Sequence, residues 1–225
     1  MKNQQIAEKN KKSAVLTIIG VAIMILLTGT KVMPSSRIAG YSMFVGIAFF
    51  FMTERAGRTQ DSQSGLRFNT IAADIKKPGV MIWMLLPCVS GVAALAVGNL
   101  IFSGRFVPYV MGRTGAILSF DKIVLLIGQV IIAAFGEEIA FRGFFFGKAS
   151  KLFPVWICAV VSSVVFAAGH IAVGSTGIVM YDVAMIFIDS LIFTVVYHRS
   201  GNCVISTFSH ILGNAMALVA AFVFF

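Results

Sequence analysis

The chain has 225 residues, of which 58% are hydrophobic and only 12% are charged, and its net charge is +9. This balance and a mean hydropathy of +0.92 exclude an ordinary soluble domain and indicate an integral membrane protein. The basic residues form short flanks beside apolar segments, not one patch interleaved with aromatic residues, which argues against nucleic-acid binding. A bilayer core of ~30 Å needs ~20 apolar residues per helical span, so several spans in one bundle are expected.

The predicted elements, in chain order, are membrane helices. Turn formers and charges separate seven apolar stretches, two of which contain charged residues: Ser13 to Thr30, Ile38 to Thr53, Gly79 to Phe102, Ile123 to Gly147, Pro154 to Ala172, Gly177 to Tyr197 and Asn202 to Phe225. The fold class is therefore all-α, a polytopic membrane bundle of about seven, or eight, transmembrane helices. We expect residues 1–12 to form a cytoplasmic basic tail and residues 13–225 a single transmembrane domain. Within the polar connection 54–78, the segment "FNTIAADIKK" predicts a short amphipathic helix at the membrane surface.

The orientation is predicted from the lysines and arginines near the span ends. With a cytoplasmic N-terminus, twelve of the 18 basic residues fall in inside segments and five in outside loops, which favours N-terminus inside and C-terminus outside. The first apolar run is long and no small-x-small cleavage site follows it, so we interpret it as an uncleaved helix. The expected location is the plasma membrane.

The segment "GEEIAFRG" places three ionisable residues inside the fourth apolar stretch. Each such side chain costs about 2.5 to 3.5 kcal/mol at mid-bilayer, so Glu137, Glu138 and Arg142 must be paired or hydrated. Glu138 and Arg142 are four residues apart, on one helix face, and predict an ion pair. Glu137 is turned about 100° away from that face and has no such partner.

Two further apolar stretches carry polar pairs at helical spacing. In "FAAGH", Phe166 and His170 are four residues apart, and in "HILGN", His210 and Asn214 are four apart, so each pair shares a helix face. Two histidines and an unpaired glutamate inside membrane spans point to a functional site, although a single histidine there would more often be a hydrogen-bonded core residue.

A hairpin at Phe153 and Pro154 would bring two of these residues to one depth. Glu137 and His170 lie equally far from that turn along two antiparallel helices. Asp182 and Asp189, seven apart in the sixth stretch, share a face and either line the same polar cavity or bind internal water.

The motifs "EEIAFR", "FAAGH" and "HILGN", in this order and in separate spans, resemble the signature motifs EExxxR, FxxxH and HxxxN of the CPBP family. These are the CAAX-protease and bacteriocin-processing proteins, also called Abi or CAAX prenyl protease 2-like. The resemblance covers about residues 123–215. One departure lies in the sixth helix, where relatives often carry glycines and this chain has Ser190 and Thr194.

The resemblance implies an intramembrane endopeptidase whose buried polar cavity opens to the cytoplasmic side. By motif, Glu137 would be the general base and His170 would help to position water, while His210 and Asn214 would stabilise the oxyanion. Glu138 with Arg142, and Phe166, would be supporting residues. A buried carboxylate suits a base that deprotonates water, and hydrogen-bond donors suit a developing oxyanion.

A zinc-dependent mechanism is the main alternative, with Glu137, His170 and His210 as ligands. The HExxH pattern of many zinc hydrolases is absent, and a metal would leave Asn214 without a role. We therefore favour no cofactor over zinc. The expected partners are a peptide or membrane-protein substrate and the lipid bilayer, with no nucleic acid.

Two functions of other classes stay open at this point. One is a non-catalytic membrane scaffold or bacteriocin-immunity protein of the same family, in which the motifs only pack the core. The other is a proton-coupled transporter that uses the glutamates with Asp182 and Asp189, which is less favoured because no inverted repeat is visible.

Overall fold

The computed structural model describes residues 2–30, 40–57, 64–115 and 122–224, which contain helices and no strand. Every one of the seven apolar stretches contains a helix, so the expected all-helical membrane bundle is confirmed. The main helices are α1 (Lys2–Gly29), α2 (Tyr41–Ala56), α4 (Val80–Ile101), α6 (Ile123–Glu137), α8 (Val155–Ala168), α9 (Thr176–Ser200) and α10 (Cys203–Phe224).

Short helices complete the described chain. They are α3 (Ile71–Ile75), α5 (Phe106–Gly115), the π-helix η3 (Glu138–Phe146) and α7 (Gly147–Ala149). Helix α3 lies within the segment for which a short surface helix is predicted. Helix α1 begins at Lys2, so residues 2–12 extend the first helix, and the boundary between tail and domain stays a prediction.

Five helical segments among the described residues are long and apolar enough to cross a bilayer: Ile6–Gly29, Val80–Ile101, Ile123–Ala149, Thr176–Ser200 and Cys203–Phe224. Val155–Ala168 is a shorter apolar helix. Helix α2 has 16 residues and packs along α1. In the described part of the chain, the main helices match the predicted count of about seven, although α2 and α8 are shorter than a full membrane span.

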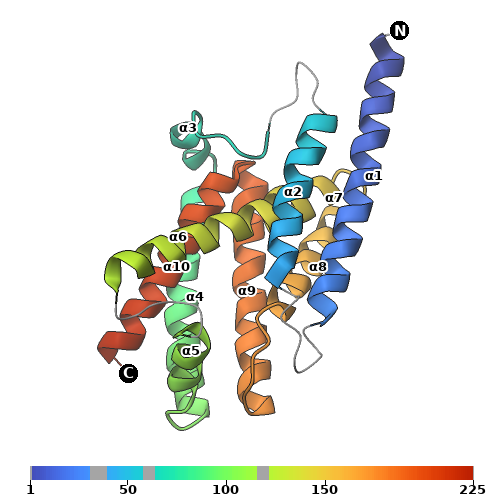
Figure 1. Cartoon of the computed structure of the whole chain (residues 1–225). Coiled ribbons are helices and arrows are strands. Elements are labelled where there is room, and N and C mark those ends of the chain that lie inside the picture. Colours follow the sequence, from blue (N-terminus) through green and yellow to red (C-terminus); the bar gives the residue numbers. More distant parts are fainter. Residues whose placement is uncertain (1, 31–39, 58–63, 116–121, 225) are drawn as a thin grey trace.

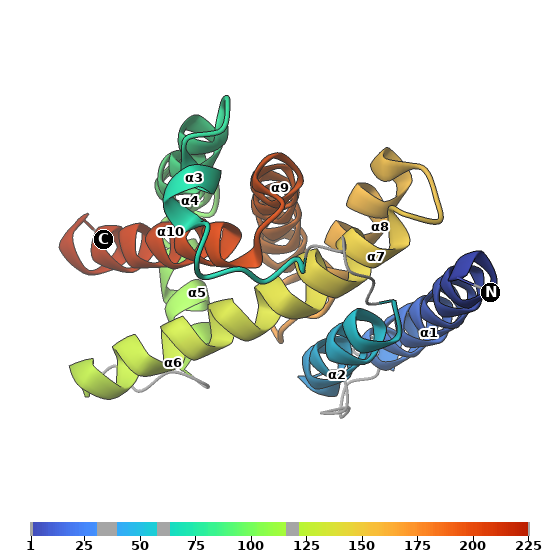
Figure 2. The same cartoon turned by 90° about the horizontal axis from the view of Figure 1, so that it is seen from above.

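The motif helix, formed by α6, η3 and α7, crosses the bundle at a steep tilt relative to α4 and α9 (Figure 1). Seen from above, it runs diagonally between the pair α1 and α2 and the group α4, α9 and α10 (Figure 2). All nine residues of η3 are buried. This central position is possible because "EIAFRGFFF" is apolar apart from one acid and one base that pair with each other.

The core around η3 is aromatic and tightly packed. Its buried side chains include Phe50 from α2, Phe141 and Phe144 from η3, and Phe166 from α8. Glycine permits the closest approach between helices, because a Cβ on Gly46 of α2 would lie 2.6 Å from Cβ and 2.9 Å from Cα of Ala140. Small residues therefore let α2 pack directly on the motif helix.

Candidate active site

Glu138 and Arg142 form a fully buried ion pair at the centre of the bundle. The Arg142 Nη1 atom lies 2.9 Å from Oε1 of Glu138, and the side chains are 1% and 0% exposed. Arg142 Nη2 also donates to Oγ of Ser190 at 2.8 Å and to the Ser190 carbonyl at 3.1 Å. The predicted ion pair is confirmed. Both residues lie in the π-helix η3, whereas the spacing argument assumed an α-helix.

Two aromatic rings enclose the Arg142 guanidinium. Its Cζ atom lies 4.5 Å from the Phe166 ring centroid and 5.2 Å from that of Phe193. Cation–π attraction in a desolvated position stabilises such an arrangement by about 2 kcal/mol. The phenylalanine of the "FAAGH" motif thus supports the ion pair, and Phe193 is a site residue that the motifs did not identify.

His210 is held in place by the same ion pair. Its Nδ1 atom lies 3.0 Å from Oε1 of Glu138, and its ring stacks on Phe193 with centroids 4.4 Å apart. Because an ionised carboxylate can only accept, Nδ1 carries the proton of this bond. The other nitrogen, Nε2, lies 3.7 Å from Oε2 of Glu137.

Glu137 has a different environment from Glu138, although the two are adjacent in sequence. Its side chain is 23% exposed, whereas that of Glu138 is 0% exposed. It lines a cavity of about 310 Å³ together with Phe166, His170, His210 and Asn214. The predicted division into one buried, paired acid and one acid left open is therefore confirmed.

His170 lies in a different position from the one predicted. Helix α8 ends at Ala168, so His170 belongs to the following turn and not to a helix face shared with Phe166. Its Nδ1 atom lies 2.9 Å from the Phe166 carbonyl oxygen, and the two rings are 4.7 Å apart. His170 reaches the same cavity as Glu137, but the closest recorded ionisable partner of Glu137 is His210.

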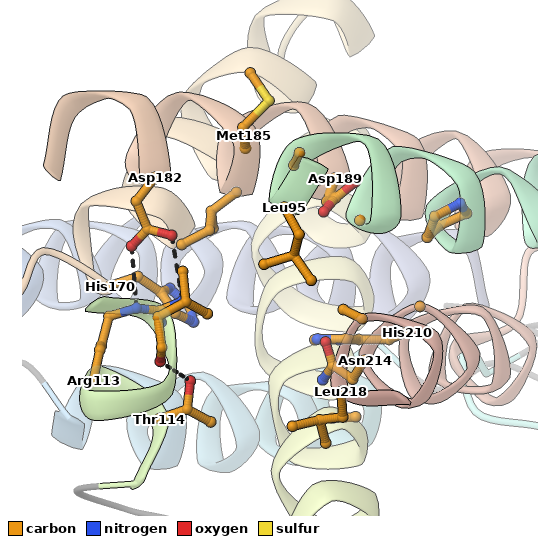
Figure 3. Close-up of a pocket in the computed structure, with 18 of the residues that line it drawn as sticks. Leu95, Arg113, Thr114, His170, Asp182, Met185, Asp189, His210, Asn214 and Leu218 are labelled. Atoms are coloured by element: carbon orange, nitrogen blue, oxygen red, sulfur yellow. Dashed lines mark hydrogen bonds and ion pairs between the residues drawn. The ribbon is translucent and has the colours of Figure 1, made fainter. Parts of the chain in front are cut away.

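Asn214 follows His210 by one turn of α10 and borders the same cavity (Figure 3). Unlike His210, which is buried, Asn214 is exposed. Four motif side chains thus surround one space from three directions: α6 supplies Glu137, the turn after α8 supplies His170, and α10 supplies His210 and Asn214.

Asp182 and Asp189 line the far wall of this cavity on α9, as one of the two interpretations predicts. Asp182 pairs with Arg113 of α5, whose Nε atom lies 3.1 Å from its Oδ2 (Figure 3). Asp189 accepts a hydrogen bond from Ser90 of α4. The sequence argument did not find Arg113, because this residue lies between the predicted apolar stretches and in none of the three motifs.

The cavity extends from His210 along α9 toward Asp182, and Asp182 lies near the start of α9, at the end of the bundle opposite the N-terminus (Figure 1). With a cytoplasmic N-terminus, this direction leads away from the cytoplasm. The orientation of the chain and the side on which the cavity opens both stay predictions.

The preference for no cofactor over zinc, with Glu137, His170 and His210 as the alternative ligands, stays a prediction. The Nδ1 atoms of His170 and His210 are engaged by Phe166 and Glu138, which leaves Nε2 of each ring as the nitrogen directed to other partners. Among the described residues, no three or more His, Cys, Asp or Glu side chains form a group that could hold a metal ion. We derive no step through a metal.

The fold and the site define a class, which is a polytopic membrane protein with a buried carboxylate and histidine cavity. Residues 119–216 match the model of the family described as type II CAAX prenyl endopeptidase, Rce1-like. This region contains all three motifs and is similar to that family, so the resemblance drawn from the motifs is confirmed. Comparisons with curated proteins and with solved structures give no match.

Proposed function

We propose that the protein is an intramembrane endopeptidase in which Glu137 activates water for attack on a peptide bond. The observation that carries the proposal is the contrast between the two glutamates: Glu138 is fully buried and paired with Arg142, whereas Glu137 faces the cavity beside His210. The match of residues 119–216 to the CAAX prenyl endopeptidase family model supports a CAAX-type protease.

Glu137 is the general base in this mechanism. Its carboxylate takes a proton from a water molecule in the cavity, and the resulting hydroxide attacks the carbonyl carbon of the scissile bond. Protonated Glu137 then returns the proton to the leaving amine as the C–N bond breaks. His170, at the edge of the same cavity, helps to position the water.

His210 and Asn214 supply the donors that stabilise the oxyanion. The bond from Nδ1 to Glu138 fixes the imidazole plane, so that Nε2 is the nitrogen near the Glu137 end of the cavity. The Asn214 amide lies one turn further along α10 and donates through its NH₂ group. Such donors are each worth about 3 to 4 kcal/mol in other hydrolases.

The Glu138, Arg142 and Ser190 group holds the catalytic residues in position. Arg142 connects η3 to α9, and Glu138 connects η3 to α10 through His210. The serine at 190, which departs from the glycine of many relatives, thus provides a hydrogen-bond partner for the arginine. This departure is compatible with activity.

The substrate is a peptide or a membrane-protein segment, and its identity can be found by comparative peptidomics. Membranes from cells that express the wild type or Glu137→Gln would be compared by mass spectrometry of peptide termini. We expect new termini with the wild type only, since the amide cannot take a proton from water. Identical termini in both samples would favour the scaffold or immunity function of the same family.

A further inference from the structure

A second cavity, of about 330 Å³, lies outside the motif site at the N-terminal end of the bundle. Helices α1, α2 and α7 surround it, and their ends can be followed in Figure 2. The polar residues that line it include Ser13, Thr17, Thr53, Glu54, Lys148 and Lys151. The proposed proteolysis uses none of them.

Positive charge exceeds negative charge around this cavity. Lys148 forms an ion pair with Glu54, and both side chains are largely buried. Lys151 is exposed, and no recorded ion pair or side-chain hydrogen bond joins its amino group to another described residue. Although part of the Lys151 side chain reaches solvent, desolvation and the neighbouring Lys148 charge lower the pKa of its amino group, and they outweigh the opposite effect of the Glu54 carboxylate. One carboxylate thus faces two ammonium groups.

The hydroxyl groups of the cavity are already oriented by the helices. Thr17 donates to the Ser13 carbonyl oxygen at 2.8 Å, and Thr53 donates to that of Phe49 at 2.8 Å. Their oxygens make the wall polar, whereas the lysines keep free N–H groups to donate. An incoming group must therefore be an acceptor and an anion.

The surroundings of the cavity are those of a membrane surface. On α1, the neighbouring side chains Val15 and Ile18 are about half exposed and apolar, as expected for contact with lipid chains. Near the lysines, Phe153 and Trp156 are exposed, and aromatic side chains of this kind are enriched at the bilayer interface. A ligand with a phosphate and acyl chains matches both the basic cavity and the apolar surface around it.

We propose that this cavity binds the phosphate of an anionic phospholipid headgroup through Lys148 and Lys151. Basic pockets between transmembrane helices bind such headgroups, and each lysine near the surface contributes about 1 kcal/mol. Because α7 directly continues η3, a lipid bound there braces the end of the motif helix. Free phosphate has the same binding chemistry, so the test includes it.

Native mass spectrometry of the detergent-purified full chain tests the proposal. The probes are phosphatidylglycerol, phosphatidylcholine and inorganic phosphate at equal concentrations. We expect phosphatidylglycerol to bind more tightly than phosphatidylcholine, and Lys151→Gln to weaken its binding about fivefold, the equivalent of one lysine contact. Lys76→Gln is the control, because Lys76 is an exposed lysine of the polar segment between α2 and α4.

A second variant tests whether lipid binding needs the space of the cavity or only the positive charge of the surface. Ala14→Leu keeps every charge but fills the space, since Ala14 lines the cavity. We expect it to weaken phosphatidylglycerol binding at least as much as Lys151→Gln does. Unchanged binding in both variants, or equal binding of the two lipids, would overturn the proposal. Inorganic phosphate that binds as tightly as the lipid would overturn the lipid assignment and support a free-phosphate site.

Discussion

Glu137 and Glu138 are adjacent in the chain, and the fold gives them opposite surroundings. Glu138 has Arg142 and His210 as partners and no exposure to solvent, whereas Glu137 is open to the cavity. A buried charge is stable only when it is paired, so the pair is a structural feature of the core. The chemistry is left to the acid that lacks such a partner.

Arg142→Met should lower the free energy of unfolding of the protein. It would leave the Glu138 carboxylate buried without its cation, which typically costs about 3 to 5 kcal/mol. Thermal unfolding in detergent measures this loss, and Arg105→Met, at an exposed arginine, is the control. A loss below about 1 kcal/mol would contradict a buried ion pair at this position.

At the scale of elements, the π-helix η3 places nine consecutive buried residues against its neighbours. A π-helix within an α-helix is frequently found at functional sites. Here it lies directly after Glu137, so the change of winding separates the open acid from the buried one. Close packing by α2 holds this segment in place.

Gly46→Ala should destabilise the contact between α2 and η3. The new Cβ would lie 2.9 Å from the Ala140 Cα, a backbone atom that cannot move without shifting η3. We expect a loss of about 1 to 3 kcal/mol, as for other overpacked cores. Gly128→Ala in α6 is the matched control, because nothing lies within 4 Å of its Cβ position, and it should leave stability unchanged or raise it. Equal effects of the two changes would argue against tight packing at Gly46.

At the scale of the whole molecule, the polar segment between α2 and α4 is fastened to the junction of α9 and α10. Asp74 is the centre of this junction: Arg67 Nη2 lies 3.1 Å away, Lys77 Nζ 2.7 Å away, and the Asn202 amide donates at 2.9 Å. Burial alone would raise the pKa of Asp74, but the bonds from Lys77, Thr70, Asn202 and Arg67 outweigh it and lower the pKa.

This lowered pKa predicts a loss of stability in acid. The unfolded pKa of an aspartate is about 3.9, so the contribution of Asp74 is fully present above that pH and is lost as the pH falls toward the lower folded value. Asp74→Asn should reduce the melting temperature at pH 7 and weaken its dependence on pH below about 4. Glu8→Gln, at an exposed acid of α1, is the control. If the melting temperature of Asp74→Asn fell in acid as steeply as that of the wild type, this role of Asp74 would be contradicted.

The sequence predicts much of this arrangement and misses specific parts of it. Apolar length and helical spacing predict the bundle, the ion pair and the open acid, because these depend on local periodicity. The positions of Ser190, Phe193 and Arg113 depend on how α9 and α5 pack, which no single-helix pattern contains. His170 falls outside α8 because the helix ends two residues earlier, and helix ends are poorly encoded by apolar periodicity.

The most direct test of the central claim is peptide cleavage by the purified protein in lipid nanodiscs, with Glu137→Gln and His198→Gln measured in parallel. His198 lies near the end of α9 and does not line the cavity, so its variant is the matched control. General-base catalysis contributes about 10²- to 10⁴-fold, and we expect Glu137→Gln to lose at least about 100-fold in rate while its melting temperature is kept. A chelator should leave the wild-type rate unchanged. Wild-type rates in a folded Glu137→Gln variant would contradict the assignment of Glu137 as the base.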